Sequence, residues 1–320
     1  MLRSLFIYLS KAVWARNIVT RWSFAWRAAS RFIAGEKLED AIKVIKNLNA
    51  NGIVATLDHL GEHTNNIQDA QKATQDILQI FDEIERASVK ANVSIKLTQI
   101  GLAVDKELCK DNLVKILGYA KEKQSFVRID MEDSSCVEVT LGLYHRMRDE
   151  FGFDNTGVVI QSYLYRSAGD VQKIMENGGR VRLCKGAYKE PAEVAFPKKS
   201  GVDKNYDLLT EMLIDGALAN GAPENSADGL HPPIPAIASH DPTRLLHAKA
   251  YAREKGLPIR ALEFQMLYGI RRDLQEQLAQ EGYPVRVYVP YGTEWYPYYV
   301  RRLAERPANL WFFISNFFRR

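Results

Sequence analysis

The sequence predicts an α/β protein of the (β/α)8 barrel class, with a helical arm before the barrel. Eight short apolar runs alternate with longer segments of helical periodicity, which is the pattern of repeated β-α-β units in a parallel sheet. No Pro-, Gly- or Ser-rich linker divides the 320 residues. Eight such units in one undivided segment favour a closed, TIM-like barrel over an open sheet.

The expected strands are short and apolar, as strands buried on both faces should be. They are residues 53–57, 93–97, 126–129, 157–160, 181–183, 235–238, 261–264 and 285–289. The expected helices are residues 67–87, 106–123, 137–150, 168–176, 206–220, 242–255 and 271–280. Residues 189–205 and 221–235 are expected to be loops within the barrel domain. Pro290 and Gly292 are expected to end the last strand.

Residues 1–50 are expected to form a helical arm, with the barrel at 51–309 and a short tail at 310–320. The arm has six basic residues before its first acid, interleaved with aromatic residues. A mitochondrial presequence has a similar composition, and so do amphipathic helices with a basic face toward an acidic or lipid surface. Structural helices are favoured, because the pattern continues without a loop into a helix expected at Leu38–Leu48.

Net charge and cysteine content exclude several classes of protein. A net charge of +4 is too small to indicate a nucleic-acid-binding protein. The three cysteines are far apart and include no CxxC pair, so neither a disulfide framework nor a cysteine zinc site is expected. A reducing compartment, the cytoplasm, is therefore the expected location.

The tail, Leu310–Arg320, contains tryptophan, isoleucine and four phenylalanines and ends in two arginines. It is too short to cross a bilayer. Two interpretations remain open for it. It could insert into a membrane interface, which would place the protein peripherally on the inner face of the membrane, or it could pack on the barrel.

Polar side chains occur at or just after the carboxyl ends of the predicted strands, where (β/α)8 barrels carry their active sites. They are Asp58, Glu62, Lys96, Asp130, Gln161, Arg182, Lys185, Ser239, His240, Glu263, Gln265 and Tyr288. If the barrel is correct, these charged and amide groups converge on one mouth. The sequence therefore predicts a single polar site there.

The helix expected after the last strand has one face that carries Tyr298, Arg301, Arg302 and Glu305. Two adjacent guanidiniums repel each other unless an anion lies between them, and their planar donors match a carboxylate. A solvated, charged helix face is the alternative. The aromatic residues around the pair, such as Trp295, favour a carboxylate-binding lid.

Other short motifs are less informative. His59–His63 (HLGEH) matches a zinc motif, but Gly61 interrupts the helix that would place both histidines on one face, so no metal is expected. The sequence contains neither a GxGxxG dinucleotide motif nor a P-loop. The turn at Lys185–Gly186 could hold an anion or be an ordinary βα turn. Ser239–Asp241 is no hydrolase triad, because adjacent residues cannot align in that mechanism.

Taken together, the strand-end segments resemble the flavin-dependent proline dehydrogenase family. The matching segments are LGE at 60–62, SIKLTQIG at 94–101, RIDMEDS at 128–134, VIQSYLYRS at 159–167, VRLCKGAYKEP at 181–191, ASHD at 238–241, EFQMLYGI at 263–270, YVPYG at 288–292 and YYVRRLAERPAN at 298–309. Each segment alone is a weak signal. The set is specific, because the segments follow the family's order along residues 52–309.

The resemblance implies a distorted (β/α)8 barrel whose last helix lies over the mouth. It also implies non-covalent FAD, oxidation of L-proline to Δ1-pyrroline-5-carboxylate, and transfer of the electrons to a membrane quinone. The chain has no second catalytic domain for oxidising the product, so it resembles the monofunctional bacterial type.

The resemblance also implies which residues bind the substrate. The residues that match those holding or packing on proline are Lys96, Leu267, Tyr288, Tyr298, Arg301 and Arg302. Asp130 is implied as a catalytic residue that organises Lys96 and nearby tyrosines. Glu62 is implied as a gate that pairs with Arg301.

For the cofactor, the resemblance implies a second set of residues. They are Met131, Gln161, Arg182, Lys185, Gly186, Ala187, Ser239 and His240. Among them, Arg182 is implied to take part in catalysis near the flavin N5 edge, and Gln161 to lie on the pyrimidine side. Ser239 and Asp241 stand where some relatives carry Thr and Asn.

Two alternatives remain open. A flavoenzyme on the same barrel could prefer hydroxyproline, although Tyr288 would crowd a hydroxyl group near ring C4. A degenerate barrel could serve as a binding or scaffold protein, although the complete set of site residues argues against this.

Overall fold

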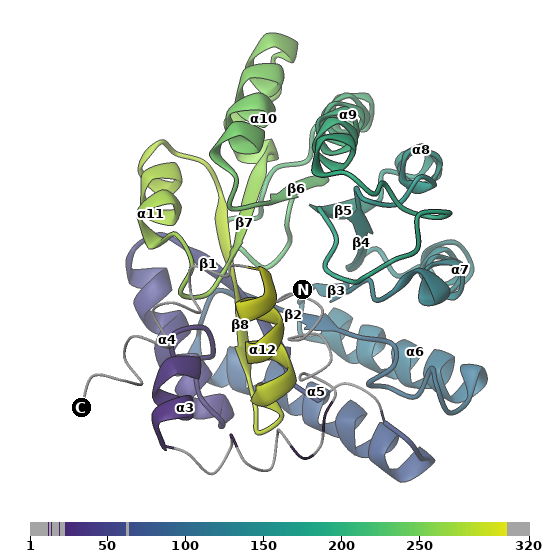
Figure 1. Cartoon of the computed structure of the whole chain (residues 1–320), viewed down its shortest axis with the longest axis vertical. Helices are drawn as coiled ribbons and strands as arrows, with labels where there is room; N and C mark the ends of the chain where they lie inside the picture. Colours follow the sequence, from purple (N-terminus) through teal and green to yellow (C-terminus); the bar gives the residue numbers. More distant parts are fainter. Residues whose placement is uncertain (1–11, 13, 15–18, 20–22, 62–63, 306–320) are drawn as a thin grey trace.

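The computed structural model describes residues 12, 14, 19, 23–61 and 64–305. In this part of the chain, eight parallel strands close into one barrel in sequence order, with the last strand paired to the first (Figure 1). The strands are β1 (Val54–His59), β2 (Ala91–Ile95), β3 (Val127–Ile129), β4 (Thr156–Gln161), β5 (Arg180–Cys184), β6 (Pro235–Ala238), β7 (Glu263–Leu267) and β8 (Val285–Tyr291). The predicted barrel is confirmed.

Helices surround the barrel, and most of them follow the strands as predicted (Figure 1). The helical segments are α3 (Ser23–Ala29), α4 (Leu38–Ala50), α5 (Ile67–Ala87), α6 (Lys106–Glu122), η1 (Ser134–Cys136), α7 (Val137–Asp149), α8 (Ser167–Glu176), α9 (Lys199–Ala219), α10 (Pro242–Lys255), η2 (Ile259–Ala261), α11 (Arg272–Gln280) and α12 (Trp295–Glu305). Asn66, Asp105 and Asp241 cap α5, α6 and α10, because their side chains accept hydrogen bonds from N–H groups of the first turn. Among the described helices, none is long and apolar enough to span a membrane.

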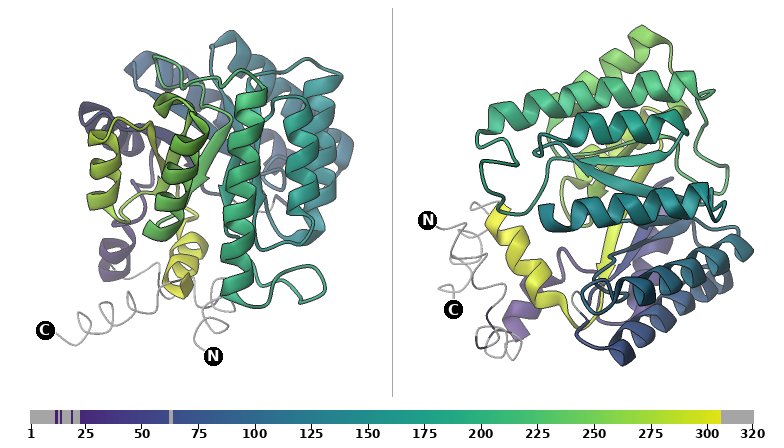
Figure 2. Two further views of the ribbon diagram at one scale, coloured as in Figure 1. Left: turned by 90° about the horizontal axis from the view of Figure 1, so that it is seen from above. Right: turned by 90° about the vertical axis from the view of Figure 1, so that its right-hand side faces the viewer.

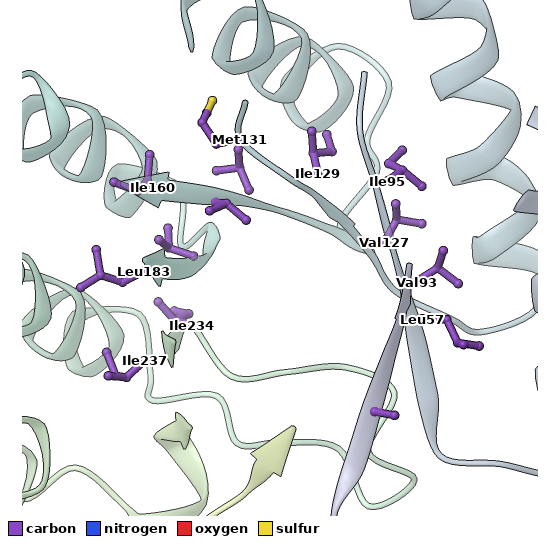
Figure 3. Close-up of a cluster of buried hydrophobic side chains, with 14 of the residues drawn as sticks. Leu57, Val93, Ile95, Val127, Ile129, Met131, Ile160, Leu183, Ile234 and Ile237 are labelled. Carbon is purple, nitrogen blue, oxygen red and sulfur yellow. The ribbon is translucent and has the colours of Figure 1, made fainter. Parts of the chain in front are cut away.

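Strand residues alternate between a polar interior and an apolar exterior. Hydrogen bonds from Arg182 on β5 to Ser94 on β2 and Gln265 on β7 cross the barrel, which identifies the polar face as the interior. Apolar residues between them in sequence pack against the helices (Figure 3). Branched apolar side chains usually fill the interior of such barrels. Here the interior is instead built from charged and amide groups.

The loop before β6 closes the amino end of the barrel. Asn92 and Arg286 point down from the interior and donate hydrogen bonds to the carbonyls of Leu230 (3.0 Å) and Gly229 (2.7 Å). Gly229 has φ +73°, and a Cβ there would lie 2.5 Å from a Val54 methyl group, so only glycine fits. Residues 221–235 thus form a loop, as predicted, and its backbone satisfies buried donors of the barrel.

A second apolar cluster lies outside the main core and joins α3 to α12. Ala25 and Ala29 of α3 pack with Trp295, Tyr299 and other residues of α12. Figure 2 shows α3 in purple beside α12 in yellow at one end of the barrel. The cluster therefore ties the helical arm to the helix that follows the last strand.

Three boundary expectations are wrong. Helix α9 begins at Lys199, inside the expected loop 189–205, because its first turns are polar and show no hydrophobic period. Strand β8 continues through Pro290. At Pro290 the strand has passed the end of β7, so the missing N–H leaves no ladder bond unmade, and the carbonyl accepts from Ala34 (2.9 Å). The arm also contains a non-helical connection between Ala29 and Leu38.

Gly157→Ala should lower the free energy of unfolding by about 1–3 kcal/mol, the usual cost of overpacking a core. A Cβ at this position on β4 would lie 2.4 Å from Nη1 of Arg128 and 2.5 Å from the carbonyl oxygen of Arg180. Urea denaturation measures the change. Gly142→Ala in α7 is the control, because no neighbouring atom lies within 4 Å of that Cβ. It should stabilise by about 0.5–1 kcal/mol, and equal effects of the two changes would contradict this packing.

His231 in the closing loop predicts a loss of stability at mildly acidic pH. Burial lowers the pKa of His231, and the charge of Arg180 lowers it further. The unfolded chain then binds a proton that the folded chain excludes, so stability falls as the pH drops from about 6.5 toward the folded-state pKa. Urea midpoints at pH 8 and pH 5.5 should differ less in His231→Gln than in the unchanged protein. The pH 8 value isolates the contact loss, and an unchanged difference between the two midpoints would contradict the prediction.

Candidate active site

A cavity of about 360 Å³ lies at the carboxyl ends of the strands, under α12. Its lining includes the predicted site residues Lys96, Asp130, Met131, Gln161, Arg182, Lys185, Gly186, Ala187, Ser239, His240, Leu267, Tyr288, Tyr298, Arg301 and Arg302. The structure thus brings together residues from β2 through α12 that are far apart in sequence. Glu62 lies outside the described residues, and so does the side chain of Glu305.

Asp130 is the centre of a buried hydrogen-bond network. Its Oδ1 accepts from Nη1 of Arg182 at 2.7 Å, and its Oδ2 accepts from the Tyr288 hydroxyl at 2.7 Å. The ammonium of Lys96 lies 3.7 Å from the same Oδ2. Burial raises the pKa of Tyr288 well above its usual value, and the charge of Asp130 adds to the effect. Tyr288 is therefore a neutral hydrogen-bond donor that Asp130 holds in place.

Asp58 at the end of β1 holds the other side of Lys96. The Lys96 ammonium donates to both Asp58 oxygens, at 2.9 and 3.1 Å, and lies 3.4 Å from the Tyr288 hydroxyl. Burial raises the pKa of Asp58, and the Lys96 charge acts in the opposite direction. Asp58 was expected only as a polar strand-end residue. Its place at the end of β1 was the available signal, and it fixes Lys96 as firmly as Asp130 does.

Arg182 is held at several points in the floor of the cavity. Its Nη1 donates to Asp130 and to Ser94 (3.1 Å), and its Nε donates to Gln265 (2.5 Å). Its guanidinium also lies 5.3 Å from the centre of the Tyr288 ring. The side chain is 4% exposed, so it presents a fixed, buried positive charge to the cavity.

Helix α12 contributes the roof of the cavity. Tyr298, Arg301 and Arg302 line the cavity, whereas Trp295 and Tyr299 pack toward α3. Trp295 meets Trp26 edge-on at 5.4 Å, and the Arg302 guanidinium lies 5.1 Å from the Tyr298 ring centre. The predicted face of the helix therefore does point to the site, and the aromatic residues around it anchor the helix to the arm.

The basic turn after β5 is already neutralised by neighbouring carboxylates. Lys185 donates to Asp203 of α9 at 2.6 Å and to Asp241 at 2.7 Å. Gly186 has φ +108°, and a Cβ there would lie 2.3 Å from the Tyr163 ring. The sequence indicated the turn but not its acidic partners, because Asp203 lies in the segment expected to be a loop.

The cavity offers polar groups that fit a flavin. The Oε1 atom of Gln161 is buried and has no hydrogen-bond partner among the described residues, whereas its Nε2 donates to the Glu132 carbonyl at 3.2 Å. The unused acceptor suits the N–H of a pyrimidine ring. Arg182 supplies a fixed cation, and the Gly186 turn leaves room for a ligand to approach the backbone. The donor set thus fits a ring system with an acidic N–H and an electron-accepting edge.

A protein-family model described as proline dehydrogenase matches residues 41–314. This chain belongs to the proline dehydrogenase family. Membership makes it an oxidoreductase that acts on proline, at the first step of proline catabolism. The resemblance inferred from the strand-end segments is thereby confirmed.

Curated proline dehydrogenases of similar length are also similar in sequence. Proline dehydrogenase 1 of Bacillus subtilis is 39% identical, with 99% of each chain covered. The proline dehydrogenase of Deinococcus radiodurans is 40% identical over 91% of this chain and 90% of its own. The expected likeness to the monofunctional bacterial type of proline dehydrogenase is therefore confirmed.

A solved structure supports the same fold. The crystal structure of proline utilization A from Bdellovibrio bacteriovorus, inactivated by N-propargylglycine, matches with a TM-score of 0.79 and 29% sequence identity. The match covers 88% of this chain but 33% of that protein, so this proline dehydrogenase spans about a third of its larger relative.

Proposed function

We propose that this chain oxidises L-proline to Δ1-pyrroline-5-carboxylate, with FAD as its non-covalent cofactor and a membrane quinone as the electron acceptor. FAD, when bound, accepts the hydride from the proline ring. The observation that carries the proposal is the pairing of a buried, charged floor with two arginines on the roof of one cavity. Such a site can fix a small amino acid by its carboxylate and press its ring against a cofactor.

Within this proposal, α12 and Lys96 hold the substrate. Arg301 and Arg302 clamp the carboxylate from above, and Lys96 reaches it from the floor, oriented by Asp58 and Asp130. The aromatic rings of Tyr288 and Tyr298 and the side chain of Leu267 pack on the apolar part of proline. This division of roles needs no movement of the floor, because the residues there are fixed by buried hydrogen bonds.

The cofactor lies along the strand ends from β3 to β6 in this proposal. Arg182 lies at the electron-accepting edge of the flavin and Gln161 at its pyrimidine ring, where its unused oxygen accepts the ring N–H. The remaining contacts come from Met131, Lys185, Gly186, Ala187, Ser239 and His240. The Leu267 N–H donates to Nε2 of His240 at 3.0 Å, which leaves the ring proton of His240 on Nδ1.

Substrate selection and access belong to the same proposal. Asp130 holds the Tyr288 hydroxyl at 2.7 Å, so this ring cannot turn aside for a hydroxyl group near ring C4. Proline is therefore preferred over 4-hydroxyproline. Glu62 pairs with Arg301 as a gate when the site is empty.

We assign the FAD site to the barrel at 51–309 and a supporting role to the arm at 1–50. The aromatic tail at 310–320 is proposed to touch the inner face of the membrane, where quinone is found. Both ends of this assignment rest on residues outside the described part of the chain, and they are inferred from composition alone.

A visible spectrum of the purified protein tests the proposal. We expect flavin bands that bleach when proline is added without oxygen, and that return when a soluble quinone analogue is added. 4-Hydroxyproline should bleach the bands more slowly at equal concentration. A folded, colourless protein that binds no added FAD would contradict the cofactor, and flavin bands unaffected by proline would contradict the substrate.

A further inference from the structure

We infer that Glu263 is a positioning residue: it sets the amide orientation of Gln265 and, through it, the plane of the Arg182 guanidinium. The inference rests on the proposed function, in which Arg182 lies at the flavin edge. Glu263 does not line the cavity, and it acts only through its neighbours.

The orientation of Gln265 follows from the chemistry of its two partners. Glu263 and Gln265 are two residues apart on β7, so both side chains face the interior. The Gln265 Nε2 donates to Glu263 at 2.5 Å, and Nε of Arg182 donates to the Gln265 Oε1 at 2.5 Å. A carboxylate only accepts and an arginine only donates. The amide therefore has one satisfactory orientation, with its NH2 group toward Glu263 and its oxygen toward Arg182.

Glu263 is itself fixed by a fully buried ion pair. Nε of Arg286 lies 3.1 Å from each Glu263 oxygen, and the side chains are 0% and 1% exposed. Arg286 also donates to the carbonyls of Ala55 (2.8 Å) and Gly229 (2.7 Å). The carboxylate thus has a fixed position, referenced to the strand β1 and to the loop that closes the barrel.

The plane of Arg182 depends on two attachments. Asp130 and Ser94 hold Nη1 at one end of the guanidinium, and Gln265 holds Nε at the other. With only the first attachment, the group can rotate about Nη1. If Glu263 lost its charge, the Gln265 amide could turn and present NH2 to the Arg182 Nε–H, which would place two donors face to face.

A double-mutant cycle in the flavin-loaded enzyme tests the inference. Glu263→Gln and Gln265→Met keep side-chain volume, and each should slow flavin reduction by proline roughly tenfold while KM changes less than threefold, as for loss of one hydrogen bond to a charged group. The double variant should match Gln265→Met within about twofold, because Glu263 acts through the amide. The flavin midpoint potential should follow the same pattern, and crystal structures of the variants should show a rotated Arg182.

Two further variants separate positioning from stability. Arg286→Met should reduce the urea midpoint but leave flavin reduction within about twofold, since Glu263 still orients the amide. If Glu263→Gln folds poorly, Glu263→Gln with Arg286→Met removes both buried charges and serves in its place. Independent, multiplied effects in the cycle, or an unmoved Arg182 with an unchanged potential, would overturn the inference. If the unchanged enzyme is not reduced by proline at all, the proposed function fails, and the Arg182 orientation in the crystals still decides the inference.

Discussion

Asp130→Ala should lower kcat/KM for proline by roughly two to three orders of magnitude. Breaking a buried ion pair by removing one partner typically costs about 3–5 kcal/mol, because the other charge is left buried without compensation. Asp130 holds Arg182, Tyr288 and Lys96 at once, with hydrogen bonds of 2.7 Å to the first two. Its loss frees a group at the proposed flavin edge and two groups at the proposed substrate site. Steady-state kinetics and the rate of flavin reduction by proline measure the effect.

Two variants serve as controls for this loss. Asp130→Asn keeps one acceptor oxygen, so it should lose less activity than the alanine variant. Asp133→Ala lies just outside the cavity, where Asp133 caps η1 through a hydrogen bond to Ser135, and it should change kcat/KM by less than about threefold. If Asp130→Ala lowered kcat/KM less than fivefold, Asp130 could not be the organising residue of the site.

Removing either Arg301 or Arg302 should lower kcat/KM for proline by roughly ten- to two-hundredfold. A hydrogen bond to a charged group is worth about 1.5–3 kcal/mol. Both side chains line the cavity from α12, while Tyr298 under the Arg302 guanidinium limits its movement. The loss should appear mostly in KM if the carboxylate is held equally in the ground state and the transition state. Steady-state kinetics of Arg301→Ala and Arg302→Ala with proline measure it.

Proline amide tests the charge requirement directly. The amide has no carboxylate, so its kcat/KM should be low and nearly the same in the unchanged enzyme and in Arg302→Ala. Arg271→Ala is the matched control, because Arg271 is a surface residue paired with Asp273 and should not affect either substrate. An equal response of proline and its amide to the α12 variants would rule out the carboxylate clamp.

The barrel and the list of residues at its mouth could be predicted from the sequence because both follow from local periodicity. In a parallel barrel, a polar residue at the end of an apolar run must face the same mouth as its counterparts on the other strands. Lys96, Asp130 and Arg182 were found in this way. Gly186 and the arginines of α12 added the weaker signals of a turn and a helical face.

What the sequence did not show depends on contacts between distant segments. Nothing local to Lys185 predicts that Asp203 and Asp241 neutralise it, since one lies on α9 and the other caps α10. The start of α9 at Lys199 was missed because charged residues carry no hydrophobic period. The ion pair of Asp58 with Lys96 required the register of β1 against β2.

The separate apolar cluster that joins α3 to α12 bears on how the molecule opens. In the described part of the chain, the buried residues of these two helices belong to this cluster, whereas the strands and the surrounding helices share the main core. A unit with its own small core can unfold locally at a lower free energy than the whole domain. Backbone amides in Trp295–Glu305 and Ser23–Ala29 should therefore exchange with deuterium together, and well before those of β1 to β8. Access to the cavity would then be governed by the stability of this cluster, even in residues that never approach the substrate.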